Sequence, residues 1–440
     1  MDDDGRSRDS LPRALAAAED ASPVEALESV TLELGRALGA TEISFLIADL
    51  SGRALVRMAH IPLADDATGD QPPGREPGSR RGRRHMSEEH ATVLPFDGGP
   101  AEQAVRTQTA QVVPPGEGGD PEGWTVLAPV TERGESIGLL EMVLPSQPEP
   151  RSIAEIARAA HLLAFVVIAN RRHTDLFEWG QRTRPFSLSA EIQRRLLPPA
   201  FTCEAGAFTL SAWLEPAADI GGDTFDYSQD RDVLHLSLTD AMGHGVASAL
   251  TATLCLGSLR NSRRRGASLL DQAAACNAEM AEYAEGVRSE SYATGILGRL
   301  DLRTGALTLV NAGHVAPYLA RGDDVHHLDL PKQLPLGLFA DAGYLATTVQ
   351  LEPGDRVVLV TDGMLERNAA DFSIVGGIGS TRALHPREVT RSLADRILEL
   401  TGHALADDAT LLVLDWHGDH GEDRSADEGS DSARASAPLV

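Results

Sequence analysis

The chain has 440 residues, an ordinary apolar fraction of 42% and a formal net charge of −26, so it is long enough for two domains with sizeable cores. The strong negative charge argues against nucleic acid and anionic membrane surfaces as partners, because both repel an acidic protein. The three cysteines, Cys203, Cys255 and Cys276, show no CxxC spacing, which argues against a disulfide framework or a thiolate zinc site.

The chain shows no sequence signal for secretion or for a membrane span. Its N-terminal sequence, MDDDGRSRDS, contains no apolar signal core. The longest apolar run, at residues 162–168, is bounded by His161 and Arg171 and falls well short of the roughly 20 residues needed to cross a bilayer. We therefore expect a cytoplasmic protein with no membrane partner.

The N-terminal part reads as a flexible start followed by a helix and strands. Residues 1–22 are charged and Ala-rich, and we expect them to be flexible. The Ser-Pro pair that follows is a helix start signal, and apolar residues recur on one helical face as far as Leu38. Residues 42–50 and 54–58 predict two strands around a Ser-Gly turn. Residues 61–92 cluster Pro, Gly and Arg without aromatics, which favours a solvated insertion over an anion or nucleic-acid patch.

Regular structure resumes with a helix-to-strand segment at residues 99–113 and an antiparallel hairpin whose turn is Arg133-Gly134. A helix is predicted at residues 153–170. This order resembles a GAF domain over residues 23–170; a PAS-like sensor or an inert dimerisation domain would read similarly, and no residue set identifies a ligand. The segments that carry the resemblance are ALGATEISFLIADLSG, GGPAEQAVRTQTAQVV and LAPVTERGESIGLLEMV.

Residues 171–202 are expected to form a helical linker with a break near Pro185. Apolar residues at helical spacing between Ile153 and Val167 can pack on the same domain's sheet or on a second subunit, and both interpretations stay open. We expect a homodimer in this region, and we expect the helix AEIQRRLLPP (190–199) to transmit the state of the sensor to the domain that follows.

The C-terminal half mixes strands and helices without strict alternation, which is typical of an α+β domain with two sheets that carry helices outside. The tail, residues 418–440, is rich in Asp, Ser, Gly and Ala and is predicted to be disordered. Strands are predicted at residues 233–239, 292–300, 307–311, 356–361 and 410–415, and helices at 246–260, 269–285 and 386–401.

Aspartates recur at strand ends in this half, mostly beside glycine. Asp223 follows Gly-Gly, Asp240 and Asp362 each end an apolar strand, and Asp407 and Asp408 precede the last strand. Each one alone is ordinary turn chemistry. If the sheets stack, however, these rims converge, and the carboxylates need cations to neutralise them. Hard oxygen ligands favour Mg²⁺ or Mn²⁺, and two such ions can activate water for attack on a phosphoryl group.

Eight segments taken in order resemble the PPM (PP2C-like) phosphatases, in their SpoIIE/RsbU-type bacterial branch. The resemblance covers residues 188–416, and the order of the segments makes coincidence improbable. The segments are AEIQRRLLPP, EPAADIGGDTFDY, LSLTDAMGHGVASALTA, YATGILGRLD, LVNAGHVAPYL, LPLGLF, LEPGDRVVLVTDGMLE and DDATLLVL.

The resemblance implies an αββα sandwich with two Mn²⁺ or Mg²⁺ ions at one edge. By motif, Asp240 would bridge both ions and Ala241 would offer its backbone carbonyl. Asp362 and Asp407 would complete the shell of the second ion, with Asp408 as the alternative to Asp407. Asp223 would act through metal-bound water.

Three further residues lie in these motifs. His244 is a candidate general acid, or simply a surface histidine. Asn311 and His314 are expected to shape a loop. A third metal site is not expected, because the segment ESYATGILG lacks an aspartate.

The leading hypothesis is a metal-dependent serine/threonine phosphoprotein phosphatase regulated by the GAF-like domain. The resemblance implies a phosphorylated anti-sigma-factor antagonist of the STAS type as its substrate. The alternatives are a catalytically weak or inactive signalling scaffold, and a dimetal nuclease, which the acidic charge disfavours. The expected organisation is a flexible N-terminus (1–22), a GAF-like sensor domain (23–170), a helical linker (171–202), a phosphatase domain (203–417) and a disordered acidic tail (418–440).

Overall fold

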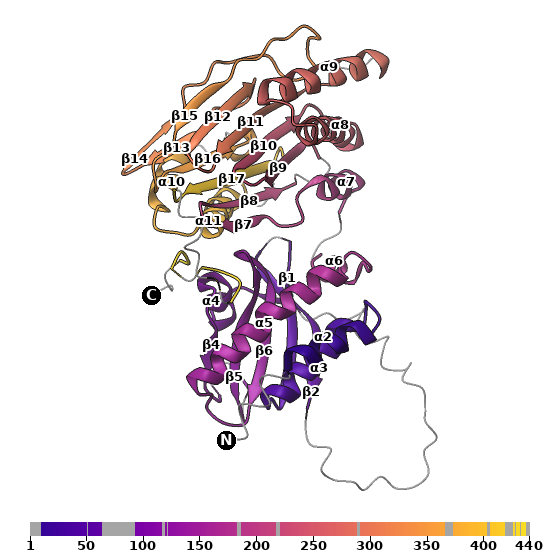
Figure 1. The fold of residues 1–440 in the computed structure, drawn as a ribbon, viewed down its shortest axis with the longest axis vertical. Helices are drawn as coiled ribbons and strands as arrows, with labels where there is room; N and C mark the ends of the chain where they lie inside the picture. Colours follow the sequence, from indigo (N-terminus) through magenta and orange to yellow (C-terminus); the bar gives the residue numbers. More distant parts are fainter. Residues whose placement is uncertain are drawn as a thin grey trace. The chain divides into compact units, whose positions relative to one another are not determined.

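The chain forms two compact units, one of Met1–Pro185 with Ser425–Val440 and one of Phe186–Arg424 (Figure 1). We describe each unit by itself. The computed structural model describes residues 10–50, 52–63, 93–116, 119–120, 122–182, 186–216, 221–287, 291–365, 373–402, 405–418, 426, 428–431 and 433–436. The predicted Arg-rich insertion therefore lies almost wholly outside the described residues.

The first unit is built on a six-stranded antiparallel sheet in the order β3-β2-β1-β6-β5-β4. The predicted hairpin is present as β5 and β6, which pair around the Arg133-Gly134 turn, where both residues have positive φ. The strands are β1 (Glu42–Ala48), β2 (Ala54–Pro62), β3 (Val93–Pro95), β4 (Gln111–Val113), β5 (Trp124–Glu132) and β6 (Glu135–Leu144).

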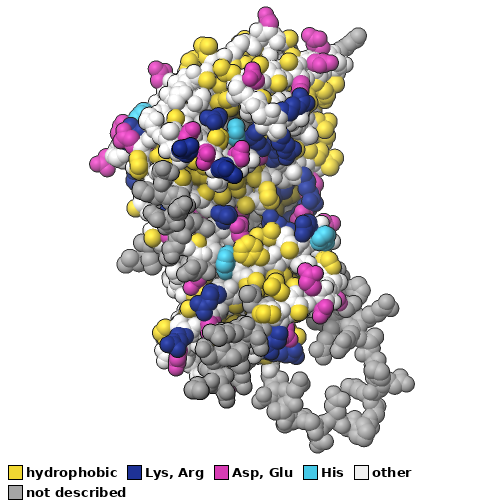
Figure 2. Space-filling model, in the orientation of Figure 1, with side chains coloured by type: hydrophobic (Ala, Val, Ile, Leu, Met, Phe, Trp, Pro, Cys, Tyr) yellow, Lys and Arg dark blue, Asp and Glu magenta, His cyan; other side chains and the backbone are white. Residues whose placement is uncertain are grey.

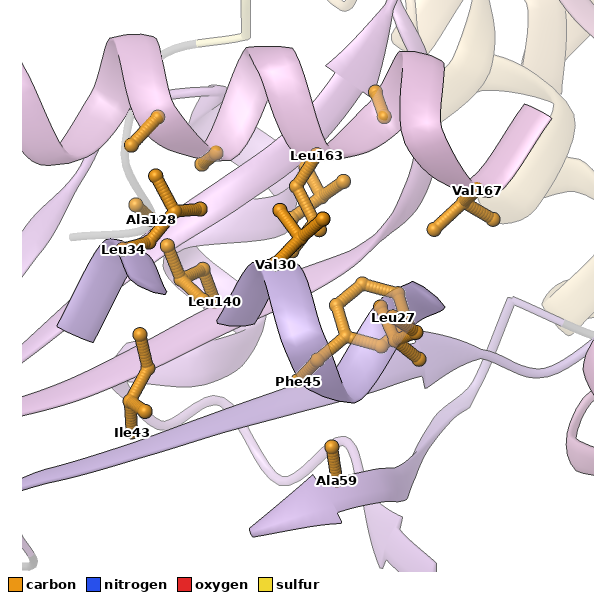
Figure 3. Close-up of a cluster of buried hydrophobic side chains, with 14 of the residues drawn as sticks. Leu27, Val30, Leu34, Ile43, Phe45, Ala59, Ala128, Leu140, Leu163 and Val167 are labelled. Carbon is orange, nitrogen blue, oxygen red and sulfur yellow. The ribbon is translucent and has the colours of Figure 1, made fainter. Parts of the chain in front are cut away.

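Two helices, α3 (Ala26–Leu38) and α5 (Pro150–Asn170), cover one face of this sheet. Figure 3 shows Leu27 and Val30 of α3 meeting Phe45 of β1 and Leu163 of α5 in the core between them. The opposite face packs a smaller apolar cluster beneath α4 (Pro100–Thr107). Alternate residues of β1 supply the two clusters, because successive side chains of a strand point to opposite faces.

The face of α5 for which two interpretations stood open packs within its own unit. Ile156, Ala160, Leu163 and Val167 are buried in the core over the sheet. This 21-residue helix is nevertheless long and apolar enough to cross a membrane by length and composition, with 44% of its most apolar window buried, so the expectation that no segment qualifies is wrong on those two criteria. A core helix of a soluble unit passes the same test, and the homodimer stays a prediction.

Both ends of the chain are more structured than the sequence predicted. Residues 10–20, expected to be flexible, form α2 (Ser10–Asp20), whose Ala14 is fully buried in the same core. In the tail, Ser430, Asp431 and Ser436, which belong to the first unit, are buried. Both corrections have one cause: small side chains can be buried by tertiary contacts that a polar local sequence does not reveal.

The second unit contains two stacked antiparallel sheets with strand orders β15-β12-β11-β10-β9 and β14-β13-β16-β17-β8-β7. Their facing sides share one apolar core, to which Phe225 and Leu236 contribute from one sheet and Phe208 and Leu412 from the other. The strands are β7 (Thr202–Ala205), β8 (Phe208–Glu215), β9 (Asp223–Gln229), β10 (Val233–Ala241), β11 (Ala293–Asp301), β12 (Ala306–Ala312), β13 (Tyr318–Arg321), β14 (Asp324–His327), β15 (Thr347–Gln350), β16 (Arg356–Val360) and β17 (Ala409–Trp416).

Helices cover the outer sides of both sheets, so the unit is the expected αββα sandwich. The pair α8 (Gly245–Arg264) and α9 (Leu269–Val287) packs on the five-stranded sheet. The pair α10 (Ile374–Ser380) and α11 (Pro386–Leu400) packs on the six-stranded sheet. The expected linker, residues 171–202, divides between the units: α6 (Leu176–Gly180) belongs to the first, and α7 (Leu188–Leu196) belongs to the second and lies beside α8.

Replacing Phe225 with Ala should weaken the sandwich. Its ring is fully buried between the sheets and meets the Phe201 ring edge-on at 4.8 Å between centroids. We expect the free energy of unfolding of the second unit to fall by about 3–5 kcal/mol. Urea titration followed by hydrogen exchange of β17 would read that unit separately. The control, Leu345→Ala, changes a side chain that is 64% exposed and should shift the transition little; equal shifts for both variants would contradict the assigned core.

Candidate active site

The five predicted aspartates come together at one rim of the sandwich. Asp223 begins β9 and pairs directly across from Asp240, near the end of β10. In the other sheet, Asp362 follows the end of β16, while Asp407 and Asp408 immediately precede β17. Because β16 and β17 are antiparallel neighbours, the end of one and the start of the other share an edge.

The carboxylate of Asp223 joins the two sheets. It is 2% exposed, and its Oδ2 accepts hydrogen bonds from Thr361 Oγ1 at 2.8 Å and Thr410 Oγ1 at 2.6 Å. Both hydroxyls belong to the six-stranded side, whereas Asp223 belongs to the five-stranded sheet. The two rims are therefore held at a fixed separation by hydrogen bonds as well as by the apolar core.

Asp407 and Asp408 differ in orientation. The Asp408 carboxylate is buried, and its Oδ2 accepts from Gln193 Nε2 at 2.8 Å and from the backbone N–H of Gly222 at 3.1 Å. Asp407 is exposed, and its Oδ1 accepts from the backbone N–H of Asp408 at 2.8 Å. The geometry therefore turns Asp408 inward as a structural acceptor and leaves Asp407 on the solvent side of the rim.

Two glycines allow backbone to approach the rim closely. A Cβ on Gly222 would lie 2.4 Å from the carbonyl oxygen of Ala241, and a Cβ on Gly363 would lie 2.0 Å from the carbonyl oxygen of Asp408. No side chain fits at either distance. The Gly222 carbonyl in turn accepts from the Ala241 N–H at 3.1 Å, which fixes the Ala241 peptide beside Asp240.

The carboxylates of the rim repel one another. Burial, together with the charges of Asp362, Asp407 and Asp408, raises the pKa of Asp240 to about 7. Burial and the charges of Asp240 and Asp408 likewise raise the pKa of Asp223 well above its usual range, although the two threonine hydroxyls oppose this. Such a cluster of acids is stabilised by a bound cation, which lowers these pKa values again.

The donor set suits hard divalent ions. It offers carboxylate oxygens and a backbone carbonyl, which are the ligands of Mg²⁺ and Mn²⁺. Among the described residues, no group of three or more His, Cys, Asp or Glu side chains is arranged to hold a metal ion by itself. Mg²⁺ usually keeps several waters when a protein binds it, so protein side chains need not fill every position around the ion.

The Asn311–His314 loop is structural, as the sequence suggested. Asn311 donates to the His314 carbonyl at 3.1 Å and accepts from the His314 N–H at 2.8 Å. The His314 ring lies 2.7 Å from Thr294 Oγ1 and 3.2 Å from the Val360 carbonyl. Burial lowers the pKa of His314 to about 4, so the neutral ring donates to Val360 and provides a second link between the sheets. His244 is exposed at the start of α8.

Three residues that contact the site were not singled out from the sequence: Gln193, Thr361 and Thr410. Each lies inside a motif that carried the family resemblance, in AEIQRRLLPP, RVVLVTD and DDATLLVL respectively. Thr361 precedes Asp362 by one residue and Thr410 follows Asp408 by two, so the signal that could have found them is a hydroxyl close to an aspartate at a strand end.

Asp240→Asn should stabilise the metal-free protein at alkaline pH. A carboxyl whose pKa is raised on folding, here from 3.8 to about 7, opposes folding increasingly as pH rises through that interval. We expect the melting temperature of the variant in EDTA to exceed that of wild type by a few degrees at pH 8, on the scale of roughly 2–4 °C per kcal/mol. The difference should shrink at pH 5. An exposed control, Asp341→Asn, should show no such pH dependence; a similar trend there would contradict the repulsion.

Residues 230–417 match the model of the family described as Stage II sporulation protein E (SpoIIE). The chain is 24% identical over 287 residues to phosphoserine phosphatase RsbU of Bacillus subtilis, covering 63% of this chain and 83% of that protein. It is 21% identical to phosphoserine phosphatase RsbP of the same organism, covering 53% of this chain but only 58% of RsbP. The SiaA-PP2C domain structure of Pseudomonas aeruginosa aligns with 52% of this chain and 94% of its own length, at 21% identity and a TM-score of 0.44. The match to the SpoIIE family is confined to residues 230–417, which are less than half of the chain.

Proposed function

We propose that the second unit is a metal-dependent serine/threonine phosphoprotein phosphatase. The observation that carries the proposal is the rim at which Asp223, Asp240, Asp362 and Asp407 meet from two sheets, with mutual repulsion that raises the pKa of Asp240. A purely structural rim gains nothing from that repulsion. A site for two divalent cations requires it.

Some residues of the rim would bind the ions directly, and others would position the residues that bind them. Asp240 and the Ala241 carbonyl would serve one ion, with Asp240 shared between the two. Asp362 and Asp407, both exposed at the rim, would serve the second. Asp223 is already engaged by Thr361 and Thr410, so it would position the neighbouring strand end and orient water at the ions.

When bound, two Mn²⁺ or Mg²⁺ ions would lower the pKa of water enough for it to lose a proton and attack phosphorus, and the ions would also polarise a phosphoryl oxygen. The protein contributes the spacing of the carboxylates and the fixed Ala241 peptide. This division needs no protein nucleophile. The three cysteines are poorly placed for that role, since Cys255 and Cys276 are buried beneath α8 and α9 and Cys203 lies on β7.

A protein substrate fits the surroundings of the rim. Met242, Val246 and Leu250 follow Asp240 in the chain and are 40–47% exposed, which leaves apolar surface suited to contact with a folded partner. On the face shown in Figure 2, Lys and Arg side chains are interspersed with Asp and Glu, which does not favour nucleic acid. We infer a phosphorylated STAS-type anti-sigma-factor antagonist as the substrate, in the cytoplasm. The names of the relatives RsbU and RsbP, both phosphoserine phosphatases, support only the phosphoserine part of this proposal.

Regulation by the first unit, whose GAF-like identity we also propose, would act through α7. Gln193 on this helix donates to the Asp408 carboxylate and to the Asp223 carbonyl, both at 2.8 Å. One side chain thus touches both sheets at the rim. A shift of α7 would change the separation of the carboxylates and with it the affinity for the ions.

The second candidate function is a signalling scaffold with little or no activity. The observation in its favour is that no described group of acids is arranged to hold an ion by itself. The presence of every aspartate that the family pattern requires argues for the enzyme.

Hydrolysis of p-nitrophenyl phosphate with and without Mn²⁺ distinguishes the two. We expect Mn²⁺-dependent turnover by the full chain, lost by more than about 100-fold in Asp240→Asn and reduced by roughly 10–100-fold in Asp223→Asn, because Asp223 supports the ligands without holding them. Asp341→Asn should retain wild-type turnover. Greater turnover by residues 186–418 alone would identify the first unit as an inhibitor. Inactivity of every form with either ion, and on a phosphorylated STAS protein, would favour the scaffold.

Gln193→Ala should weaken metal use more than it weakens folding. The Mn²⁺ concentration that gives half-maximal rate should rise by about 10–100-fold, the usual effect of removing a group that orients metal ligands. Arg195→Ala, an exposed change on the same helix that removes the ion pair with Glu191, is the matched control. Unchanged metal dependence in Gln193→Ala would remove α7 from the proposed regulatory route.

A further inference from the structure

The C-terminal residues return to the first unit after the chain has completed the second. The final strand of the sandwich, β17, ends at Trp416, yet Ser425–Val440 belong to the first unit. In Figure 1 this yellow C-terminal segment lies beside the strands and helices of that unit. The chain therefore passes between the two units twice.

The contact with the first unit is specific at Gly429. The N–H of Gly134, in the β5–β6 turn, donates to the Gly429 carbonyl at 3.0 Å. A Cβ on Gly429 would lie 2.1 Å from the Thr131 carbonyl oxygen and 2.6 Å from His161 Nδ1. Gly429 also has a φ of +94°, which favours glycine. Only glycine fits this position.

The surface of the first unit that Gly429 contacts is held by a hydrogen bond of its own. His161 of α5 bonds through Nδ1 to the Thr131 carbonyl at 2.8 Å, and Gly429 lies against both partners of that hydrogen bond. Thr131 is fully buried and Gly134 is buried in the hairpin turn. The segment therefore contacts a strand, a turn and a helix at once.

The segment is also folded locally. Asp431 Oδ1 accepts from the Ala433 N–H at 3.1 Å, and its Oδ2 pairs with Arg434 Nε at 3.2 Å. Ser430, Asp431 and Ser436 are 3–5% exposed. Burial of polar residues at this level requires defined partners, which an unstructured acidic tail lacks.

We propose that Gly429, Ser430, Asp431 and residues 433–436 form a C-terminal latch that docks in cis on the β5–β6 turn and α5. The latch gives the two units a second covalent connection. Eight steps separate Gly418 from Ala426 (426 − 418 = 8), a reach of at most roughly 26–29 Å. Two short connections restrict the relative motion of the units far more than one.

The latch would therefore limit how the first unit can move α7. This regulatory consequence rests on the proposed phosphatase function, whereas docking does not. The two parts are tested by separate measurements.

Hydrogen exchange at the β5–β6 turn tests docking without any activity. The full chain is compared with a chain ending at Gly418, with Gly429→Val, and with Ala433→Val, a matched β-branched change at an exposed latch position. We expect exchange at Gly134 to accelerate by about tenfold or more in the first two variants, because its acceptor is lost, and to stay at the wild-type rate in Ala433→Val. Equal exchange in all four chains would overturn the latch.

Two further readouts make the result decisive. Exchange at Phe45 reports on the core of the first unit. A wild-type rate at Phe45 in the truncated chain shows that truncation has not unfolded the first unit. If truncation has unfolded it, the comparison of Gly429→Val with wild type alone tests docking. Mn²⁺-dependent turnover is then measured on the same chains. Accelerated exchange with altered turnover supports both parts. If exchange at Gly134 accelerates while turnover is unchanged, the latch docks but has no regulatory role. If the wild-type chain shows no turnover, the result counts against the phosphatase function and does not affect the conclusion from hydrogen exchange.

Discussion

The contact on which the site most depends is the pair of hydroxyl hydrogen bonds to Asp223. Thr361 and Thr410 donate from one sheet to a carboxylate of the other, and that carboxylate starts the strand paired with Asp240. A hydrogen bond within a protein contributes about 0.5–1.5 kcal/mol net. An apolar core can hold two sheets together, whereas these directional bonds also set the position of one rim relative to the other.

A second link, from neutral His314 to Val360, complements the first. Because its pKa lies near 4, the ring stays uncharged at neutral pH and adds no charge to the rim. The sheets are thus joined on one side by a carboxylate that accepts and on the other by an imidazole that donates. A bound cation would relieve the repulsion centred on Asp240, so the free energy that this repulsion costs without an ion would contribute to the affinity for the ion.

The sequence was sufficient to predict those features of the fold and of the site that depend on a local residue pattern. The predicted strand ends place Asp240 and Asp362 at the rim where the structure has them, and apolar periodicity located α3, α5, α8 and α9 to within a few residues. The different orientations of Asp407 and Asp408 could not be predicted, because the Asp408 carboxylate accepts from Gln193, which is 215 residues away. The ordered parts of both termini were also missed. These terminal residues are buried by contacts with other segments of the chain. Their own polar or Ala-rich composition therefore predicted flexibility.

The position of α7 explains how a signal could reach the rim over a short path. Six residues separate its N-cap, Ser187, from Gln193 (193 − 187 = 6), which is about 9 Å of helix. The other end is fixed: Arg260 donates to the Leu196 carbonyl at 2.7 Å and to the buried Asp226 at 2.8 Å, and Arg263 pairs with the same carboxylate. Because the C-terminal end of α7 is held in place, a displacement of its N-terminal end at Ser187 would also move Gln193. The Asp408 carboxylate and the Asp223 carbonyl that accept from Gln193 would then respond to the first unit without any rearrangement of the apolar core between the sheets.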